Sequence, residues 1–397
     1  MDGRELRALA IAATTTLHRN SAGWIVPSQS GVGTYTVSND ALPTCTCPDY
    51  ELRQQACKRV LAVQYTIRRQ RNEGGVTVTE EVKVTYTQDR TTYNRAQCDE
   101  KARFLPILAD LCSTVTNPPQ GRGRPRLPLG DMAFQAVHRV YGGMSARRFD
   151  TDVREAKAAG FTDDDPHFNS VLTYLRKPEL TGVLRNLIAL SALPLTAVEK
   201  RFAIDSTGFS TCKFARWYDD KYGREAQRRE WIKLHAMTGV LTNIVTAVEV
   251  TGWTVNDSVM SRPLVEASAA AFSIEEVSAD KAYLSHDNFA TVAVLGGTAY
   301  VPFKSNTVEV KDDSEWSRMY HLFAYDRDRF LAHYHRRSNV ESTFSMIKRK
   351  FGDSLRSRSD QGQINEVLAK VVAHNLCVLN HAIHDLQIPQ PRFVIAS

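Results

Sequence analysis

The chain has 397 residues, of which 43% are hydrophobic and 24% are charged. These fractions are those of ordinary globular proteins, so they exclude wholesale disorder and a fibrous repeat. The apolar runs, for example residues 187–195, stop well short of the roughly 20 residues that cross a bilayer, so no membrane partner is expected. The N-terminal segment lacks the apolar stretch of a secretory signal, and we therefore expect a protein that stays inside the cell.

Basic side chains exceed acidic ones by 50 to 44, and two stretches concentrate them. Residues 336–358 carry mostly basic charges, and the segment GRGRPRLP, which begins at Gly121, carries three arginines and no acid. Such stretches attract polyanions by releasing condensed counterions. Either stretch taken alone is equally compatible with a solvated surface.

Residues 1–100 predict a small α+β module. The segments YTVS and VTVTEEVKVTYT alternate and are rich in β-branched residues, and a helix is expected from Ala56 to Arg71. Residues 117–130 follow as a basic linker, because their prolines and glycines block regular structure. Beyond this linker, apolar residues recur at helical spacing, so residues 101–200 are assigned to a helical region.

Strand-like runs dominate after residue 200. The runs RFAIDS, WIKLHAMTG and TNIVTAVEVT predict an antiparallel meander, which a helix and the short run VSAD follow. A helix at 286–295, a strand TAYVPF, a long amphipathic helix at 327–351 and a final helix at 363–384 complete the pattern. This order predicts an α/β fold in which helices cover a mixed sheet, assigned to residues 201–397.

Two aspartates stand where strands are expected to end. Asp205 closes the run RFAID and precedes Ser-Thr-Gly, which is expected to turn the chain, and Asp280 closes EEVSAD before a helix. If the two strands are neighbours, both carboxylates project into a cleft beyond the sheet edge. The alternative is that each aspartate caps a turn or a helix.

A third acid, Glu341, lies on the long helix expected at 327–351. At about 100° per residue, Tyr334, Arg337, Glu341 and Lys348 fall within a sector of about 60°. The alternative is a row of surface ion pairs. The three acids together are suited to hold two divalent cations, Mg²⁺ or Mn²⁺, because these ions prefer oxygen ligands and assist phosphoryl transfer.

These residues carry a family resemblance. The polar residues of the helix resemble the signature around the third acid of DDE transposases from bacterial insertion sequences, Tyr334-x2-Arg337-x3-Glu341-x6-Lys348. IDSTGF at Asp205 and ADKAY at Asp280 resemble the motifs around the first two acids, although family members usually have Gly where this chain has Ala282. The resemblance covers about residues 200–385.

The resemblance implies an RNase H-like catalytic domain with Asp205, Asp280 and Glu341 as ligands of two Mg²⁺ or Mn²⁺ ions. It implies that a helical DNA-binding domain precedes this core. The remaining members of the signature are implied to contact DNA near the cleavage site: Tyr334, Arg337 and Lys348.

The implied function is that of a DNA transposase. Such a protein binds the terminal repeats of its element, cleaves DNA at the ends and joins the 3′-hydroxyl ends to target DNA. Because both ends must be joined together, we expect a homodimer on double-stranded DNA, cytoplasmic and associated with the chromosome. Two alternatives are a transposase-derived DNA-binding regulator that does not cut and a structure-directed nuclease on the same core.

Three cysteines near the N-terminus resemble the first three ligands of a SWIM-type zinc finger, whose pattern is Cys-x-Cys followed by Cys-x-His. They are Cys45, Cys47 and Cys57. Arg59 stands at the histidine position, and arginine has no neutral lone pair to offer. Three alternatives are open: a Zn²⁺ site completed by His18, Asp49, Cys98 or water, a SWIM-like module that has lost its metal, and a coincidental match.

The linker segment GRGRPR resembles the core of an AT-hook, which lies in the minor groove of A·T-rich DNA. An extended basic segment suits that narrow, negatively charged groove, and a plain basic linker is the alternative. The DNA-binding candidates in the segment are Arg122, Arg124 and Arg126. Four aromatic residues are expected either to stack on exposed bases or to belong to the core: Trp217, Tyr218, Trp231 and Trp253.

Overall fold

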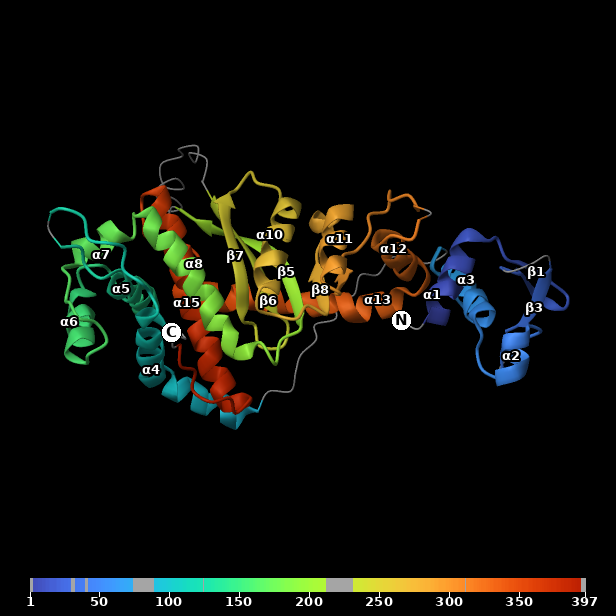
Figure 1. Cartoon of the computed structure of the whole chain (residues 1–397), viewed down its shortest axis with the longest axis horizontal. Coiled ribbons are helices and arrows are strands. Elements are labelled where there is room, and N and C mark those ends of the chain that lie inside the picture. Colours follow the sequence, from blue (N-terminus) through green and yellow to red (C-terminus); the bar gives the residue numbers. More distant parts are fainter. Residues whose placement is uncertain are drawn as a thin grey trace, which may run out of the picture.

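The computed structural model describes residues 3–29, 33–39, 42–73, 89–123, 125–211, 231–310 and 312–393. The molecule is elongated, with the first module at one end, a β-sheet near the middle and a group of helices at the other end (Figure 1). The segment VTVTEEVKVTYT lies outside the described residues.

The first module combines three helices with a four-stranded antiparallel sheet in the order β1-β2-β3-β4. Its elements are α1 (Gly3–Thr14), β1 (His18–Asn20), β2 (Gly23–Pro27), β3 (Thr34–Ser38), β4 (Thr44–Cys45), α2 (Pro48–Arg53) and α3 (Lys58–Glu73). The helix expected at 56–71 is therefore confirmed, two residues later in the chain. The module has its own apolar core, which also includes Tyr325 from the C-terminal half of the chain.

Five helices form the end of the molecule opposite to this module (Figure 1). They are α4 (Arg90–Ser113), α5 (Leu129–Gly142), α6 (Asp150–Ala158), α7 (Phe168–Tyr174) and α8 (Pro178–Ala192). The predicted domain boundary at residue 100 falls inside α4. Between α4 and α5 the described residues form neither helix nor strand, as their prolines and glycines predict.

The second sheet has five strands in the order β7-β6-β5-β8-β9. They are β5 (Arg201–Ser210), β6 (Trp231–Gly239), β7 (Val245–Gly252), β8 (Glu276–Ala279) and β9 (Thr298–Tyr300). The first three are antiparallel, which confirms the predicted meander, whereas β8 and β9 run parallel to β5. The predicted mixed sheet is therefore present.

Six further helices pack around this sheet, which confirms the α/β class. They are α10 (Asp257–Ala269), α11 (His286–Val294), α12 (Glu315–Tyr325), α13 (Arg327–Tyr334), α14 (Ser338–Phe351) and α15 (Asp360–Asp385). The prediction of one helix at 327–351 is wrong, because a 3₁₀ turn at His335–Arg337 separates α13 from α14. At this turn Arg336 reaches Glu276 of β8 while its neighbour Arg337 reaches β5, so two consecutive side chains face the sheet.

Helix α15 joins the sheet to the five-helix end of the molecule. Its buried Asn375 side chain bonds both the N–H and the C=O of Val245 in β7, and it also donates to the Ser191 hydroxyl of α8. One continuous hydrophobic core therefore runs from α4 and α5 through the sheet. Within the described residues, no helix has the length and apolar character that a membrane crossing needs.

Candidate active site

Asp205 and Asp280 lie side by side at the edge of the parallel strand pair. In the register of β5 and β8, Ile204 pairs with Ala279, and the two aspartates are the next residues on each strand. The predicted turn directly after Asp205 is wrong, because β5 continues to Ser210 in antiparallel pairing with β6. The long partner strand overrides the turn tendency of Ser-Thr-Gly.

Asp280 also acts as a cap, the alternative function considered from the sequence. Its carboxylate accepts a hydrogen bond of 2.8 Å from the Ala282 N–H, which begins the 3₁₀ turn Lys281–Tyr283. Capping uses one carboxylate oxygen, so the position does not exclude a second role for this side chain.

Glu341 faces the same region from α14. The helix buries an apolar stripe of Val340, Phe344 and Ile347, spaced three or four residues apart, against the sheet. The Asn339 side chain donates to the Val240 carbonyl at the β6–β7 turn, which fixes the start of the helix. Glu341 lies on the other side of this stripe, and its side chain is 57% exposed.

Arg337 connects the first acid with the third. Its Nη2 donates to Asp205 at 3.1 Å and to Glu341 at 3.0 Å, and its Nη1 donates to Glu341 at 3.1 Å. The guanidinium is largely buried, with 19% of the side chain exposed, and its Nε–H finds no partner among the described residues. A positive group therefore lies between Asp205 and Glu341.

Burial is the dominant influence on Asp205. It raises the pKa of this carboxyl to about 6, against the opposing effect of Arg337, and the charges of Asp280 and Glu341 raise it further. The same three acids contribute to a raised pKa of Tyr334, whose main cause is again burial. Five members of the predicted site, the three acids, Arg337 and Tyr334, thus lie close enough to interact electrostatically.

Lys348 does not contact the acids. Its ammonium donates to the Thr207 hydroxyl at 2.6 Å, two residues beyond Asp205 and on the same face of β5. Burial lowers the pKa of Lys348. The predicted residues are therefore arranged along β5, with Arg337 at Asp205 and Lys348 at Thr207.

Two neighbours of the acids were not predicted. Thr207 holds Lys348, and the ring of Tyr283 is 1% exposed at the end of the 3₁₀ turn after Asp280. Burial, with the charges of Asp257, Asp205 and Asp280, raises the pKa of Tyr283. The only signal for them in the sequence is that each lies within three positions of one of the two aspartates.

The three acids suit hard divalent cations, because such ions prefer carboxylate oxygens and because two of these carboxylates already bind the positive Arg337 guanidinium. The three acids do not form a cluster with all oxygens within 4.8 Å of one another in this structure, whereas another group among the described residues does. A metal ion between Asp205 and Glu341 would lie where the Arg337 guanidinium lies, so Arg337 would have to move.

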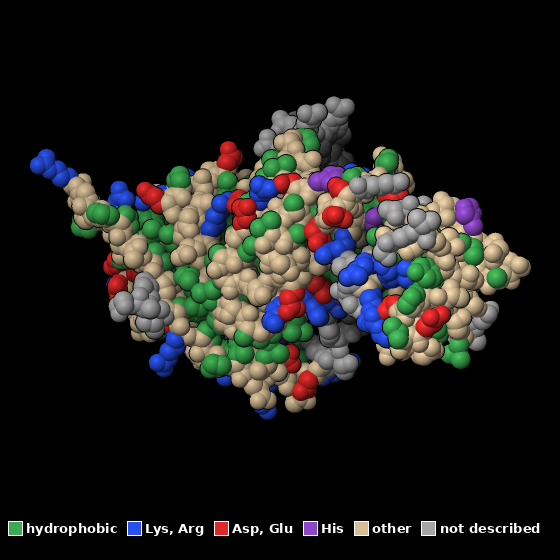
Figure 2. Space-filling model, turned by 45° about the vertical axis from the view of Figure 1, so that its right-hand side comes forward, with side chains coloured by type: hydrophobic (Ala, Val, Ile, Leu, Met, Phe, Trp, Pro, Cys, Tyr) green, Lys and Arg blue, Asp and Glu red, His purple; other side chains and the backbone are tan. Residues whose placement is uncertain are grey.

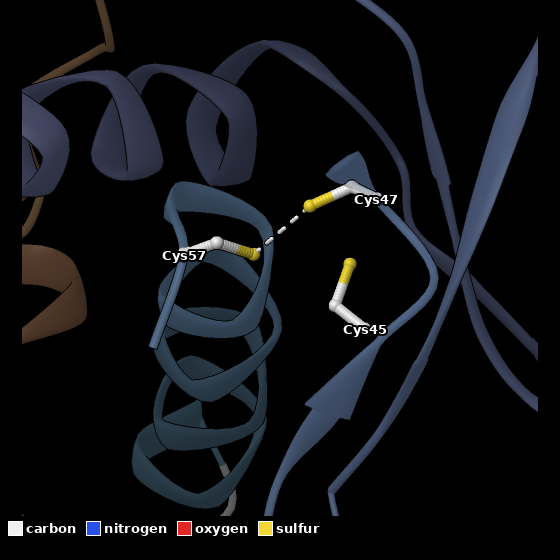
Figure 3. A group of neighbouring side chains, drawn as sticks. All are labelled: Cys45, Cys47 and Cys57. Atoms are coloured by element: carbon white, nitrogen blue, oxygen red, sulfur yellow. Dashed lines mark hydrogen bonds between the residues drawn. The ribbon is translucent and has the colours of Figure 1, made fainter. Parts of the chain in front are cut away.

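That other group consists of Cys45, Cys47 and Cys57, whose sulfurs lie within 4.8 Å of one another (Figure 3). All three are buried, and the Cys47 and Cys57 sulfurs are 3.5 Å apart. A hydrogen bond with Cys45 and the backbone N–H groups of Val60 and Arg59 lower the pKa of Cys57 to about 5, despite burial. The same hydrogen bond, together with burial, raises the pKa of Cys45, so the thiolate, which is the form that binds metals, is favoured at Cys57.

The predicted fourth ligands do not join this group in the described part of the chain. His18 and Cys98 are exposed, and Asp49 pairs with Arg53 in α2. Arg59 is buried, and its guanidinium carbon lies 4.0 Å from the centre of the Tyr35 ring. The chain therefore supplies three soft ligands in one place, and the arginine at the histidine position is engaged with an aromatic ring.

The linker arginines are on the surface. Arg122 and Arg126 are exposed, Arg126 lies 3.9 Å from Glu179, and Arg124 lies outside the described residues. Figure 2 shows one face of the molecule, on which further Lys and Arg side chains gather beside the first module. These positive side chains are interspersed with Asp and Glu.

Of the four aromatic candidates for base stacking, two lie within the described residues, and both are exposed, Trp231 by 41% and Trp253 by 55%. The core alternative is therefore excluded for both. The other two aromatic candidates, Trp217 and Tyr218, lie outside the described residues.

Two aspartates on neighbouring parallel strands and a glutamate on the helix beside them form a carboxylate site suited to metal-assisted phosphoryl transfer. The comparison with known families agrees with this class. Residues 196–376 match the family model described as the transposase DDE domain. This match confirms the resemblance of residues 196–376 to DDE transposases.

Proposed function

We propose that this transposase cleaves DNA at the ends of its element and joins the 3′-hydroxyl ends to target DNA, with Asp205, Asp280 and Glu341 as the metal ligands. One observation carries the assignment of the acids. A single guanidinium contacts both Asp205 and Glu341, and Asp280 is next to Asp205 across a parallel strand pair. The sheet order, with three antiparallel and two parallel strands, supports an RNase H-like core.

The acids would hold two Mg²⁺ or Mn²⁺ ions, which activate the attacking oxygen and stabilise charge on the phosphate when bound. Asp205 lies within β5 and Asp280 directly follows β8, so the pairing of these two parallel strands sets the two aspartates next to each other. Glu341 is on a helix that starts after a 3₁₀ turn, and its exposed carboxylate can approach from the other side. Arg337, released from the acids, can then bind a DNA phosphate with its planar donors.

The remaining DNA contacts are assigned by position. Lys348 and Tyr334 flank the acids, and the exposed linker residues Arg122 and Arg126, with Arg124, would track the DNA backbone or minor groove. Helices α4–α8 would bind the terminal repeats. A homodimer would bring the two ends together.

The test is cleavage of duplex DNA that carries the element ends, with Mg²⁺ or Mn²⁺, by the wild type and by Glu341→Gln. The variant keeps the size of the side chain and loses its charge, so we expect cleavage to fall by about a hundredfold or more. The matched control is Glu266→Gln, an exposed glutamate on α10, which should cut as the wild type does.

The products distinguish the alternatives. Nicking with joined 3′ ends supports a transposase, and nicking without joined products indicates a structure-directed nuclease. Binding of the ends without any metal-dependent cutting by the wild type would overturn the catalytic assignment and favour a DNA-binding regulator.

We propose in addition that the three cysteines of the first module bind Zn²⁺, with the fourth ligand from solvent. The support is a buried set of three sulfurs within 4.8 Å of one another. Metal analysis of the purified protein should give one zinc per chain, and Cys57→Ser should lose it. Cys98→Ser, the exposed control, should keep it, and a wild type free of zinc after zinc-supplemented expression would contradict this proposal.

A further inference from the structure

A small pocket lies between α5, the end of α14 and the start of α15, away from the cysteines and the three acids. It is small and partly open to solvent, and its lining combines charged with apolar side chains. The lining residues that matter are Arg139, Met144, Phe351, Arg356, Glu366 and Lys370.

Arg139 is the unusual member of this pocket. It is 8% exposed, and its Nε–H has no hydrogen-bond partner among the described residues. Its guanidinium is in no ion pair among the same residues, although Glu366 is close enough to interact with it electrostatically. A buried cation without a partner is costly, and burial lowers the pKa of Arg139 accordingly.

The one acid in the pocket is already engaged. The Glu366 carboxylate accepts hydrogen bonds from the backbone N–H of Arg356 at 2.9 and 3.2 Å and from that of Ser357 at 2.8 Å. It therefore fixes the loop after α14 and leaves the Arg139 donors unpaired. Lys370 is engaged as well, with the carbonyls of Gly352 and Ser354 at 2.8 and 3.0 Å.

Arg356 is on the loop that Glu366 fixes. It is exposed, and its Nη1 donates to the Met144 carbonyl at 2.5 Å, which ties the loop to the end of α5. The two arginines approach the same space from different elements, and their mutual repulsion contributes to the lowered pKa of Arg139. The lining contains three cations and one anion, so its net charge is positive.

We propose that this pocket binds a tetrahedral oxyanion, a phosphate group, through Arg139 and Arg356. Planar guanidinium groups match phosphate oxygens with paired donors, and such an anion would satisfy the buried Arg139. The phosphate group can belong to the DNA backbone or to a free anion, and these sources share the chemistry. The proposal does not depend on cleavage by the three acids.

The first experiment measures the melting temperature with inorganic phosphate, with sulfate and with chloride at equal ionic strength. Phosphate and sulfate should raise the Tm of the wild type by about 2–4 °C or more, and chloride should not. Arg139→Met and Arg356→Gln should abolish the rise. Arg154→Gln, an exposed arginine on α6 outside the pocket, is the matched control and should retain it.

Arg139→Met has a second expected effect that a structural role would not give. Without phosphate it should melt above the wild type, because it removes an unpartnered buried charge and fills the space with an adaptable apolar chain. If Arg139 instead serves only to hold the fold, the variant melts below the wild type and the proposal fails.

A second experiment identifies the source of the phosphate. Binding to a duplex oligonucleotide is measured over a range of salt concentrations for the wild type, Arg356→Gln and Arg154→Gln. Loss of one backbone contact should reduce the slope of log K against log salt by about 0.9 in Arg356→Gln alone. An unchanged slope together with a lost phosphate effect on Tm assigns a free anion. No effect of either arginine in both experiments overturns the proposal.

Discussion

Arg337 bonds directly to two of the predicted metal ligands, a contact that the sequence did not predict. The resemblance to DDE transposases implies that it contacts DNA, and in this structure it bridges Asp205 and Glu341. Both descriptions hold if the guanidinium neutralises the acids before metal binds and turns to phosphate afterwards. Arg337 would then compete with the metal.

We expect Arg337→Gln to bind Mn²⁺ more tightly than the wild type when no DNA is present. The variant removes a cation that must be displaced and leaves two carboxylates free, so the dissociation constant should fall by about tenfold, which corresponds to about 1.4 kcal/mol. Isothermal titration calorimetry measures this directly. Arg349→Gln, on the same helix and exposed, is the control, and unchanged or weaker Mn²⁺ binding by Arg337→Gln would show that the arginine does not compete.

At the scale of single residues, the sequence predicted which side chains meet but not how they pair. Asp205 and Asp280 were selected because they close predicted strands and Glu341 because it lies on a polar helix face, and the resemblance to DDE transposases joined the three. The bond from Lys348 to Thr207 and the buried ring of Tyr283 depend on the register of β5 and on the path after β8. No local pattern encodes these contacts.

At the scale of elements, α14 is held on one side by the sheet and on the other by a polar cluster. Lys350, near its end, pairs with Glu100 of α4, and the Tyr141 hydroxyl of α5 donates to the same carboxylate at 2.9 Å. Glu100 is 6% exposed. This cluster ties the helix that carries Glu341 to two helices of the opposite region.

We expect Glu100→Ala to destabilise the protein by about 1–3 kcal/mol, because it removes a buried carboxylate and leaves a partly exposed ammonium and a half-buried hydroxyl without their acceptor. Urea unfolding at neutral pH gives the free energy. Lys101→Ala, the exposed neighbour on α4, should stay within about 0.5 kcal/mol of the wild type. Equal losses for the two variants would mean that the cluster contributes no special stability.

Most elements were predictable because their patterns are local, and the exceptions have non-local causes. β5 continues past Ser-Thr-Gly because β6 pairs with it as far as Trp231. The expected long helix breaks at 335–337, where Arg336 contacts Glu276 and the His333 ring stacks on Tyr300 at 4.6 Å. Helix α12 was not predicted.

At the scale of the whole molecule, three buried histidines make stability depend on pH. Burial lowers the pKa of His138, His235 and His374 to about 4 in each case. The unfolded chain has histidine pKa values near 6.5, so between pH 6.5 and 4 it binds more protons than the folded state. The stability that neutral histidines provide is thus complete above about pH 6.5 and is lost as the pH falls to about 4.

His374→Gln isolates one of these groups. His374 is 2% exposed and its Nε2 donates to the Asn243 carbonyl at 2.9 Å, a bond that glutamine can replace. Plots of unfolding free energy against pH should be shallower for the variant by up to about 1.4 kcal/mol per pH unit between pH 6.5 and 4. His18→Gln, at an exposed site, should leave the slope unchanged, and a parallel plot for His374→Gln would refute the assignment.

The core of the first module includes Tyr325, which is 1% exposed and belongs to α12 of the DDE domain. An exchange of this module for a foreign DNA-binding domain would therefore uncover an aromatic ring and the half-buried Ala324 beside it. Glu5, which pairs with Arg329 at 3.2 Å, would be lost in the same exchange. A chimaera built at this junction will need a polar side chain at position 325 if it is to remain soluble, and one that keeps Tyr325 will tend to aggregate through the exposed patch.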